Sequence, residues 1–251
     1  MTHKTFFAAI TAFVASFIFG ADVSANDGAY QVVSPDGHLS ATVVVGSDIS
    51  YTVSRDALQL IAPSQISMTL SDGIVFGQDD KVLKVRRDSR DQVWQATVYK
   101  KSDVRDHYNE MTLEFKEFSL TFRAYDDGVA YRFASKLKGD FTVMSEKAEF
   151  AFAKDWDAFI PYVKQHTKTL ETQYFNSFEN TYKEHRLSEW NKSRLAFAPL
   201  VVNADNGVKV LLTEADLLDY PGMFLYNEGD ASTLSARFAP YPKEMKQGGH
   251  N

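Results

Sequence analysis

The sequence of 251 residues contains no cysteine, so no disulfide bond can stabilise the folded chain. An apolar core has to supply the stability instead. The sequence also lacks a G-x-S-x-G nucleophile elbow, an H-E-x-x-H metal motif and a glycine-rich phosphate loop. The enzyme classes that depend on these motifs are therefore disfavoured.

The sequence has fewer basic than acidic residues. Lysine and arginine number 27 against 33 aspartate and glutamate residues, which leaves a formal net charge of −6. An acidic surface repels the phosphates of nucleic acids. We therefore expect no nucleic-acid partner. Aromatic residues make up 14% of the chain, and we expect most of them in the core.

Long apolar runs are scarce as well. The run from Phe6 to Gly20 is shorter than the roughly 20 residues that a membrane-spanning helix needs. Lys4 precedes this run, and the small residues Val23-Ser24-Ala25 follow it, a pattern typical of a secretory signal peptide. We expect residues 1–25 to be a signal peptide, a periplasmic or extracellular location, and no membrane span.

What the sequence does contain is a series of short alternating segments. Residues 118–124 and 129–133 alternate apolar with polar side chains, and Asp126-Asp127-Gly128 lies between them. This pattern predicts a hairpin in which Gly128 adopts a positive φ. Similar alternation over residues 39–45, together with the hairpin signal Asn206-Gly207, extends the pattern along the chain. Many short strands with few helical candidates predict an antiparallel sandwich.

Three motifs stand out by their specificity: SPDGHLSATV at residues 34–43, FRAYDDGVAYRF at 122–133 and TEADLLDYPGMFL at 213–225. In this order they resemble the N-terminal domain of glycoside hydrolase family 97. The resemblance implies that residues 26–242 form one all-β, antiparallel β-super-sandwich of the galactose mutarotase-like type. Members of this family join that domain to a catalytic (β/α)₈ barrel, act as α-glucosidases or α-galactosidases, and bind calcium.

The resemblance also implies that the catalytic barrel is absent from this chain. Residues 243–251 are then a truncated linker toward a barrel in the same gene or in a split chain. We assign no catalytic residue, and we expect no hydrolysis by this polypeptide alone. The partners implied are that barrel and an α-linked oligosaccharide. An exposed apolar or aromatic patch is expected where the barrel docks.

Residues 162–191 mix charged and aromatic residues without a clear period, which predicts a long structured loop that could carry a site. The family contributes one glutamate to calcium from a Tyr/Phe-Glu-x-x-Tyr context, and residues 178–182, FENTY, match it. The resemblance therefore implies that Glu179 is a calcium ligand. Alone it would hold calcium poorly, because the ion takes about six to eight oxygens. An ordinary surface carboxylate is the alternative interpretation.

Weaker candidates for substrate binding are Trp190, His185 and Glu214. Trp190 has polar neighbours and is expected at the surface, whereas Trp94 lies within an apparent strand and is expected in the core. His185 could face a sugar hydroxyl. Glu214 could instead order the turn before Pro221-Gly222 or pack against the barrel.

Two other functions are compatible with the sequence. A free-standing secreted carbohydrate-binding protein would need a flat or concave aromatic platform. A mutarotase-like sugar epimerase would need His166 or His185 paired with a glutamate that faces a pocket.

Overall fold

The computed structural model describes residues 28–98, 100–164, 169–229 and 232–241. The expected signal peptide at residues 1–25 and the expected linker at residues 243–251 lie outside the described residues, as does His166. Within the described residues all strand pairs are antiparallel, and the only helices are three short 3₁₀ turns. The predicted all-β class is therefore confirmed. No helix in this part of the chain is long and apolar enough to cross a membrane.

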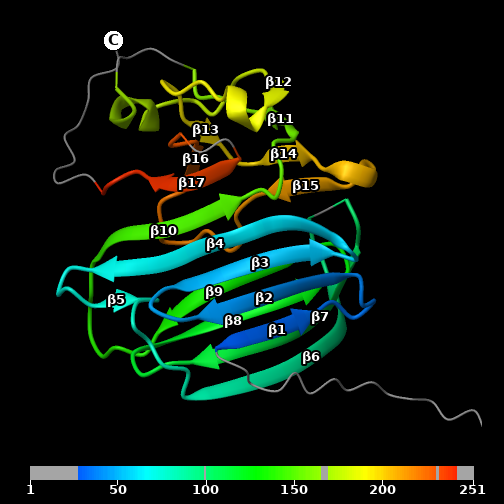
Figure 1. Ribbon diagram of the computed structural model, residues 1–251, viewed down its shortest axis with the longest axis vertical. Coiled ribbons are helices and arrows are strands. Elements are labelled where there is room, and N and C mark those ends of the chain that lie inside the picture. The colour runs from blue at the N-terminus through cyan, green and yellow to red at the C-terminus, as the bar shows by residue number, and fades with distance from the viewer. Residues whose placement is uncertain (1–27, 99, 165–168, 230–231, 242–251) are drawn as a thin grey trace, which may run out of the picture.

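The largest sheet has nine strands and runs across the front of the molecule in Figure 1. Its strands follow the order β1-β2-β3-β4-β10-β17-β16-β13, and β5 pairs with β4. They are β1 (Ala29–Val33), β2 (Leu39–Val45), β3 (Ile49–Arg55), β4 (Leu58–Leu70), β5 (Val75–Phe76), β10 (Val143–Ala151), β13 (Ala196–Phe197), β16 (Met223–Tyr226) and β17 (Thr233–Phe238). In β2 the residues Leu39, Ala41 and Val43 are buried and alternate with more exposed neighbours, as predicted.

A second sheet of four strands lies behind β1–β4 in the order β6-β7-β8-β9 (Figure 1). Its strands are β6 (Lys84–Gln95), β7 (Asp103–Glu114), β8 (Phe118–Tyr125) and β9 (Val129–Ser135). The β8–β9 hairpin predicted from FRAYDDGVAYRF is present, with Ala124 opposite Val129. Gly128 is not among the residues with a positive φ, so that detail of the prediction is wrong. The turn closes through the Tyr125 N–H, which donates to the Gly128 carbonyl at 2.7 Å.

The third sheet, in the order β12-β11-β14-β15, lies at the opposite end of the molecule from β6 (Figure 1). Its strands are β11 (Asp157–Ile160), β12 (Lys183–Arg186), β14 (Leu200–Asn203) and β15 (Lys209–Leu212). Asn206-Gly207 joins β14 to β15 with φ values of 56° and 74°, which confirms this hairpin signal.

The expected continuous loop at residues 162–191 is wrong in part. It contains the edge strand β12 and two 3₁₀ turns, Glu171–Tyr174 and Leu187–Glu189. The strand sequence KEHR has no apolar alternation, because β12 is an edge that buries little of its surface. Within the sheet, β12 pairs only with β11 among the described strands.

The main core lies between the nine-stranded sheet and the β6–β9 sheet. Phe118 of β8 is fully buried and stacks on Phe76 and Phe115 at ring distances of 4.6 and 4.4 Å. Tyr51 of β3 crosses to Phe122 of β8 at 5.9 Å. These contacts join the sheets face to face, which is the arrangement expected of a sandwich.

Candidate functional site

The Glu179 segment lies at the end of the molecule formed by β11–β16. Phe178 has a φ of 55°, a left-handed conformation that bulky side chains rarely adopt. The Phe178 N–H donates to Asn176 Oδ1 at 2.7 Å, and the Asn180 side-chain amide donates to the Tyr162 carbonyl at 2.7 Å. Both neighbours of Glu179 are therefore anchored. Backbone strain of this kind costs roughly 1–3 kcal/mol and persists where surrounding contacts enforce it.

Three aromatic residues close to Glu179 in the sequence have exposed rings. Phe175 is 91% exposed, Phe178 57% and Tyr182 45%. We call Phe175, Phe178 and Tyr182 the aromatic end. The Phe178 ring lies 5.7 Å from Phe197 and 5.8 Å from Phe224, so it rests on a small separate core. This segment therefore presents exposed aromatic side chains.

Glu179 is exposed and, within the described ranges, its carboxylate has no hydrogen bond or ion pair. No group of three or more histidine, aspartate or glutamate side chains in this part of the chain could hold a metal ion. One free carboxylate suits a hard cation such as calcium but supplies only a small part of its ligand set. Glu179 could therefore supply one oxygen ligand to a cation whose other ligands come from elsewhere.

His185 on β12 has both ring nitrogens engaged. Its Nδ1 lies 2.8 Å from the Arg186 carbonyl, and its Nε2 lies 3.0 Å from the Tyr162 hydroxyl. Because a carbonyl only accepts, Nδ1 carries the proton and Nε2 accepts from Tyr162. The Tyr162 oxygen in turn accepts from the Asn191 N–H at 2.8 Å. Neither nitrogen is left for a sugar, so the epimerase interpretation gains no support from His185.

The expected positions of Trp190 and Trp94 are both wrong. Trp190 is 3% exposed, and its indole N–H donates to the Arg194 carbonyl at 3.0 Å. The 3₁₀ turn Leu187–Glu189 directs the ring inward and leaves its polar neighbours outside. Trp94 is 59% exposed, and Val93 on the other face of β6 is 58% exposed, because this end of the edge strand extends beyond the core. Neither position could be read from adjacent residues.

Glu214 closes the TEADLLDYPGMFL segment onto itself. Its Oε1 accepts from the Met223 N–H at 2.8 Å, which supports the turn-ordering role. Burial raises the pKa of the half-buried Glu146 on β10, and the negative charge of Glu214 raises it further, while a hydrogen bond with Tyr220 opposes the change. Leu218, in the same segment, is 80% exposed. This segment therefore presents an apolar surface and an ordered turn rather than a free acid–base pair.

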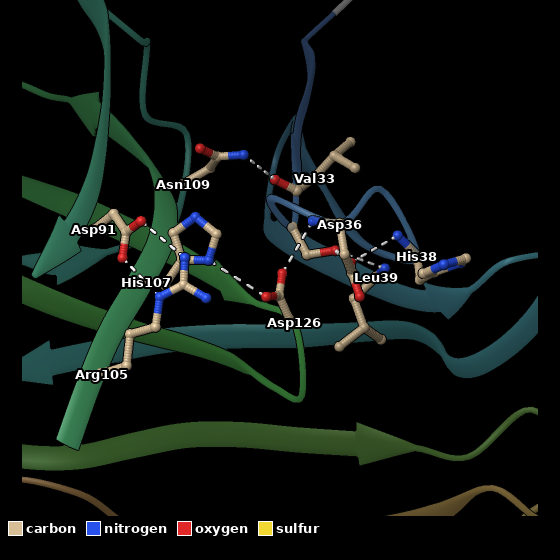
Figure 2. Close-up of polar contacts among 10 residues, drawn as sticks. Val33, Asp36, His38, Leu39, Asp91, Arg105, His107, Asn109 and Asp126 are labelled. Carbon is tan, nitrogen blue, oxygen red and sulfur yellow. Dashed lines mark hydrogen bonds and ion pairs between the residues drawn. The ribbon is translucent and has the colours of Figure 1, made fainter. Parts of the chain in front are cut away.

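The first two motifs meet in space, as Figure 2 shows. The Asp36 N–H donates to Asp126 Oδ1 at 3.0 Å, and His107 Nδ1 lies 3.4 Å from Asp126 Oδ2. Asp36 accepts in turn from the Ser34 hydroxyl at 2.5 Å and the His38 N–H at 3.0 Å, and these bonds lower its pKa. The specificity of SPDGH and YDDG is thereby explained, because they pin the β1–β2 turn to the β8–β9 turn.

A surface depression of about 490 Å³ lies beside β11 and β14. Most of its charged groups pair with one another: Asp205 accepts from the Lys154 ammonium at 2.5 Å and from the Trp156 indole N–H at 3.0 Å. Arg186 lies 3.9 Å from Asp155. Asp157 also lines the depression and is exposed. A single exposed carboxylate does not supply the two flanking carboxyl groups that acid–base chemistry on a glycosidic bond requires.

The chain is similar to known glycosidases over almost its whole described length. The glycosyl-hydrolase 97 N-terminal family model matches residues 32–243. A retaining alpha-galactosidase of Bacteroides thetaiotaomicron is 45% identical over 224 residues, which cover 88% of this chain and 34% of that protein. The chain thus spans about a third of the length of this relative.

Solved structures share the fold. A glycoside hydrolase family 97 enzyme from Pseudoalteromonas sp. strain K8, in complex with acarbose, matches with a TM-score of 0.71 and 24% identity, covering 84% of this chain and 32% of that one. A beta-arabinopyranosidase structure matches with a TM-score of 0.73 and 23% identity, covering 86% of this chain and 36% of that one.

Proposed function

The chain belongs to the glycosyl-hydrolase 97 N-terminal family, and from this premise we propose that it is the super-sandwich of an exo-acting α-glycosidase. Its role is to support a catalytic (β/α)₈ barrel and to complete the barrel's site. Alone, it hydrolyses no glycoside. The substrate of the assembled enzyme is an α-linked oligosaccharide, encountered in the periplasm or outside the cell.

The observation that carries this proposal is the aromatic end. Exposed apolar patches on monomeric proteins often mark the surface on which a partner docks. Here Phe175 and Phe178 are exposed on a segment whose backbone is held by Asn176 and Asn180. A rigid, preformed apolar surface lowers the entropic cost of docking. This is the form expected of an intramolecular domain interface that lacks its partner.

Glu179 adds a polar element to the same surface. In the proposed assembly its free carboxylate is one calcium ligand, and oxygens of the barrel provide the others. Calcium would supply positive charge that joins carboxylates from both domains. Substitution of Glu179 should therefore weaken the joined protein while leaving this chain's own fold unchanged.

A chimera tests the proposal with its natural geometry. This chain replaces the matching N-terminal third of the Bacteroides relative, and hydrolysis of p-nitrophenyl α-galactoside and α-glucoside is measured with and without a calcium chelator. We expect an active, chelator-sensitive chimera and an inactive isolated chain. The Glu179→Gln chimera should lose most of its calcium dependence, whereas Glu184→Gln, an exposed carboxylate on β12, is the matched control.

Two results would count against the proposal. Hydrolysis by the isolated chain would contradict a purely supporting role. A chimera in which Glu179→Gln and Glu184→Gln respond identically to calcium would remove Glu179 from the ligand set.

A further inference from the structure

The outer face of the β6–β8 strands carries a second feature, on the sheet that lies behind β1–β4 and is separate from the β12-β11-β14-β15 sheet (Figure 1). A depression of about 300 Å³ opens there, and its lining includes Arg90, Gln92 and Trp94 of β6 and Asp106, Tyr108 and Glu110 of β7. Ligand pockets begin at roughly this volume. The depression is therefore large enough for one sugar ring.

Strand register places these residues on one face. Gln92 pairs with Asp106, and Trp94 pairs with Val104, so alternate residues of β6 and β7 point outward together. Of the three tryptophans in the sequence, Trp94 alone is exposed. The indole of Trp94, which is 59% exposed, presents much of its flat apolar ring to solvent.

The Trp94 ring is also held in place. Its indole N–H donates to Asp106 Oδ2 at 3.3 Å, and the Gln92 amide donates to the same oxygen at 2.9 Å. Within the described residues, no hydrogen bond ends on the other oxygen of Asp106. The site thus combines an oriented aromatic platform with a free acceptor beside it.

The far wall is equally ordered. The Arg123 guanidinium lies 4.3 Å from the centre of the Tyr108 ring, and its Nε donates to Glu110 Oε2 at 2.7 Å. Tyr125 packs against Tyr108 at 5.1 Å. Since these contacts fix the wall, little side-chain entropy would be lost when a ligand binds.

The charges around the depression select the class of ligand. The acidic lining residues Asp88, Asp106 and Glu110 slightly outnumber the basic residues Arg90 and Arg123. Glu110 is paired with Arg123, and Arg90 Nε lies 3.9 Å from Asp88. An anion would meet repulsion from Asp106, whereas a neutral polyol can both donate to Asp106 and accept from Arg90.

We propose that this face is a carbohydrate-binding site for a neutral pyranose unit of a glycan, with the apolar face of the sugar on Trp94 and its hydroxyls on Asp106 and Arg90. The site lies away from the aromatic end, so it does not depend on the proposed docking of a barrel. It would hold the protein on a polymeric substrate rather than take part in hydrolysis.

Sugar titration of the full chain tests the site directly. Maltohexaose, galactomannan and oligogalacturonate are titrated while tryptophan fluorescence and heat are recorded, because Trp94 is the exposed fluorophore. We expect saturable binding of maltohexaose or galactomannan, weakened about tenfold or more by Trp94→Ala, since truncated tryptophans dominate many binding sites. Trp94→Phe should bind with intermediate affinity, because it keeps a ring and loses the N–H to Asp106.

Val93→Ala is the matched control. Val93 is 58% exposed, adjacent on the same strand, and directed to the other face. Equal affinities of Trp94→Ala and Val93→Ala would overturn the proposal, as would the absence of binding by both neutral glycans. Tighter binding of oligogalacturonate than of the two neutral glycans would show that the ligand is not a neutral sugar. A dimer of this chain that Trp94→Ala dissociates would assign the face to a second copy instead.

Discussion

The two ends of this molecule expose aromatic rings in different ways. At one end Phe175 and Phe178 lie on an irregular segment and carry no polar atom. At the other end Trp94 lies on a regular strand, and Asp106 holds its indole N–H. A phenyl ring without a polar handle favours an apolar protein surface, whereas an oriented indole beside free hydrogen-bonding groups favours a polyol. The comparison supports the docking role proposed for one end and the ligand role proposed for the other.

The ends also differ in the core beneath them. The β6–β9 sheet rests on the main core, while the aromatic end rests on the small cluster of Val163, Leu195, Phe197 and Phe224. A small cluster buries less apolar area, so it stabilises the surface above it less. The aromatic end should therefore open locally before the rest of the molecule unfolds.

Among these substitutions, Phe118→Ala should lower the free energy of unfolding the most. It should destabilise both ends of the molecule together and so remove the difference in their stability. Phe118 is fully buried and stacks on Phe76 and Phe115, so we expect a loss of about 3–5 kcal/mol in the free energy of unfolding. Urea unfolding followed by circular dichroism measures it. A loss below about 1 kcal/mol would show that the sheets pack less tightly than described.

Phe224→Ala should destabilise the aromatic end and leave the β6–β9 sheet unchanged. Phe224 is 3% exposed and contacts the rings of Tyr174 and Phe178 at 5.2 and 5.8 Å. We expect a loss of about 3 kcal/mol, the lower end of the range for a buried phenylalanine, with faster amide exchange over residues 169–197 and unchanged exchange in β6–β9. Uniformly faster exchange would contradict separate support for the two ends.

Glu146→Gln should raise stability in a pH-dependent way. Burial raises the pKa of Glu146 above its ordinary value of 4.5, so the folded state favours the neutral acid. The stability that neutral Glu146 contributes to the folded state is fully present below pH 4.5. It is lost as the pH rises through the raised pKa of the folded state. The melting temperature of the variant should exceed that of the natural chain at about pH 8 and converge with it at about pH 4. If the difference in melting temperature stayed constant between these two pH values, the ionisation of Glu146 would not be its cause.

Phe175→Ala should have the smallest effect on stability. The side chain is 91% exposed, so we expect a change within about 0.5 kcal/mol. In the chimera described above, the same substitution should weaken the domain interface, seen as faster proteolysis between the domains. Trp94→Ala in that chimera should leave the interface unchanged. If both variants weakened it equally, the distinction between the two ends would fail.

Much of the fold could be predicted because period-two alternation directly encodes a half-buried strand. Residues 118–124 and 129–133 formed the hairpin that their pattern indicated. Strand β12 could not be found in this way, because KEHR buries almost nothing and is held by backbone bonds to β11. Residues 178–182 identified the exposed Glu179 only through a motif, since a single carboxylate has no spacing to interpret.

The sequence by itself determined the all-β class, the family and most strand positions, because these depend on local alternation, turn residues and ordered motifs. Only the tertiary structure decided which rings reach solvent. Trp190 is buried and Trp94 is exposed, the reverse of what their neighbours suggest. The physical reason is that a strand has two faces and a turn can direct a side chain either way. Which face is covered depends on sheets that are distant in the chain.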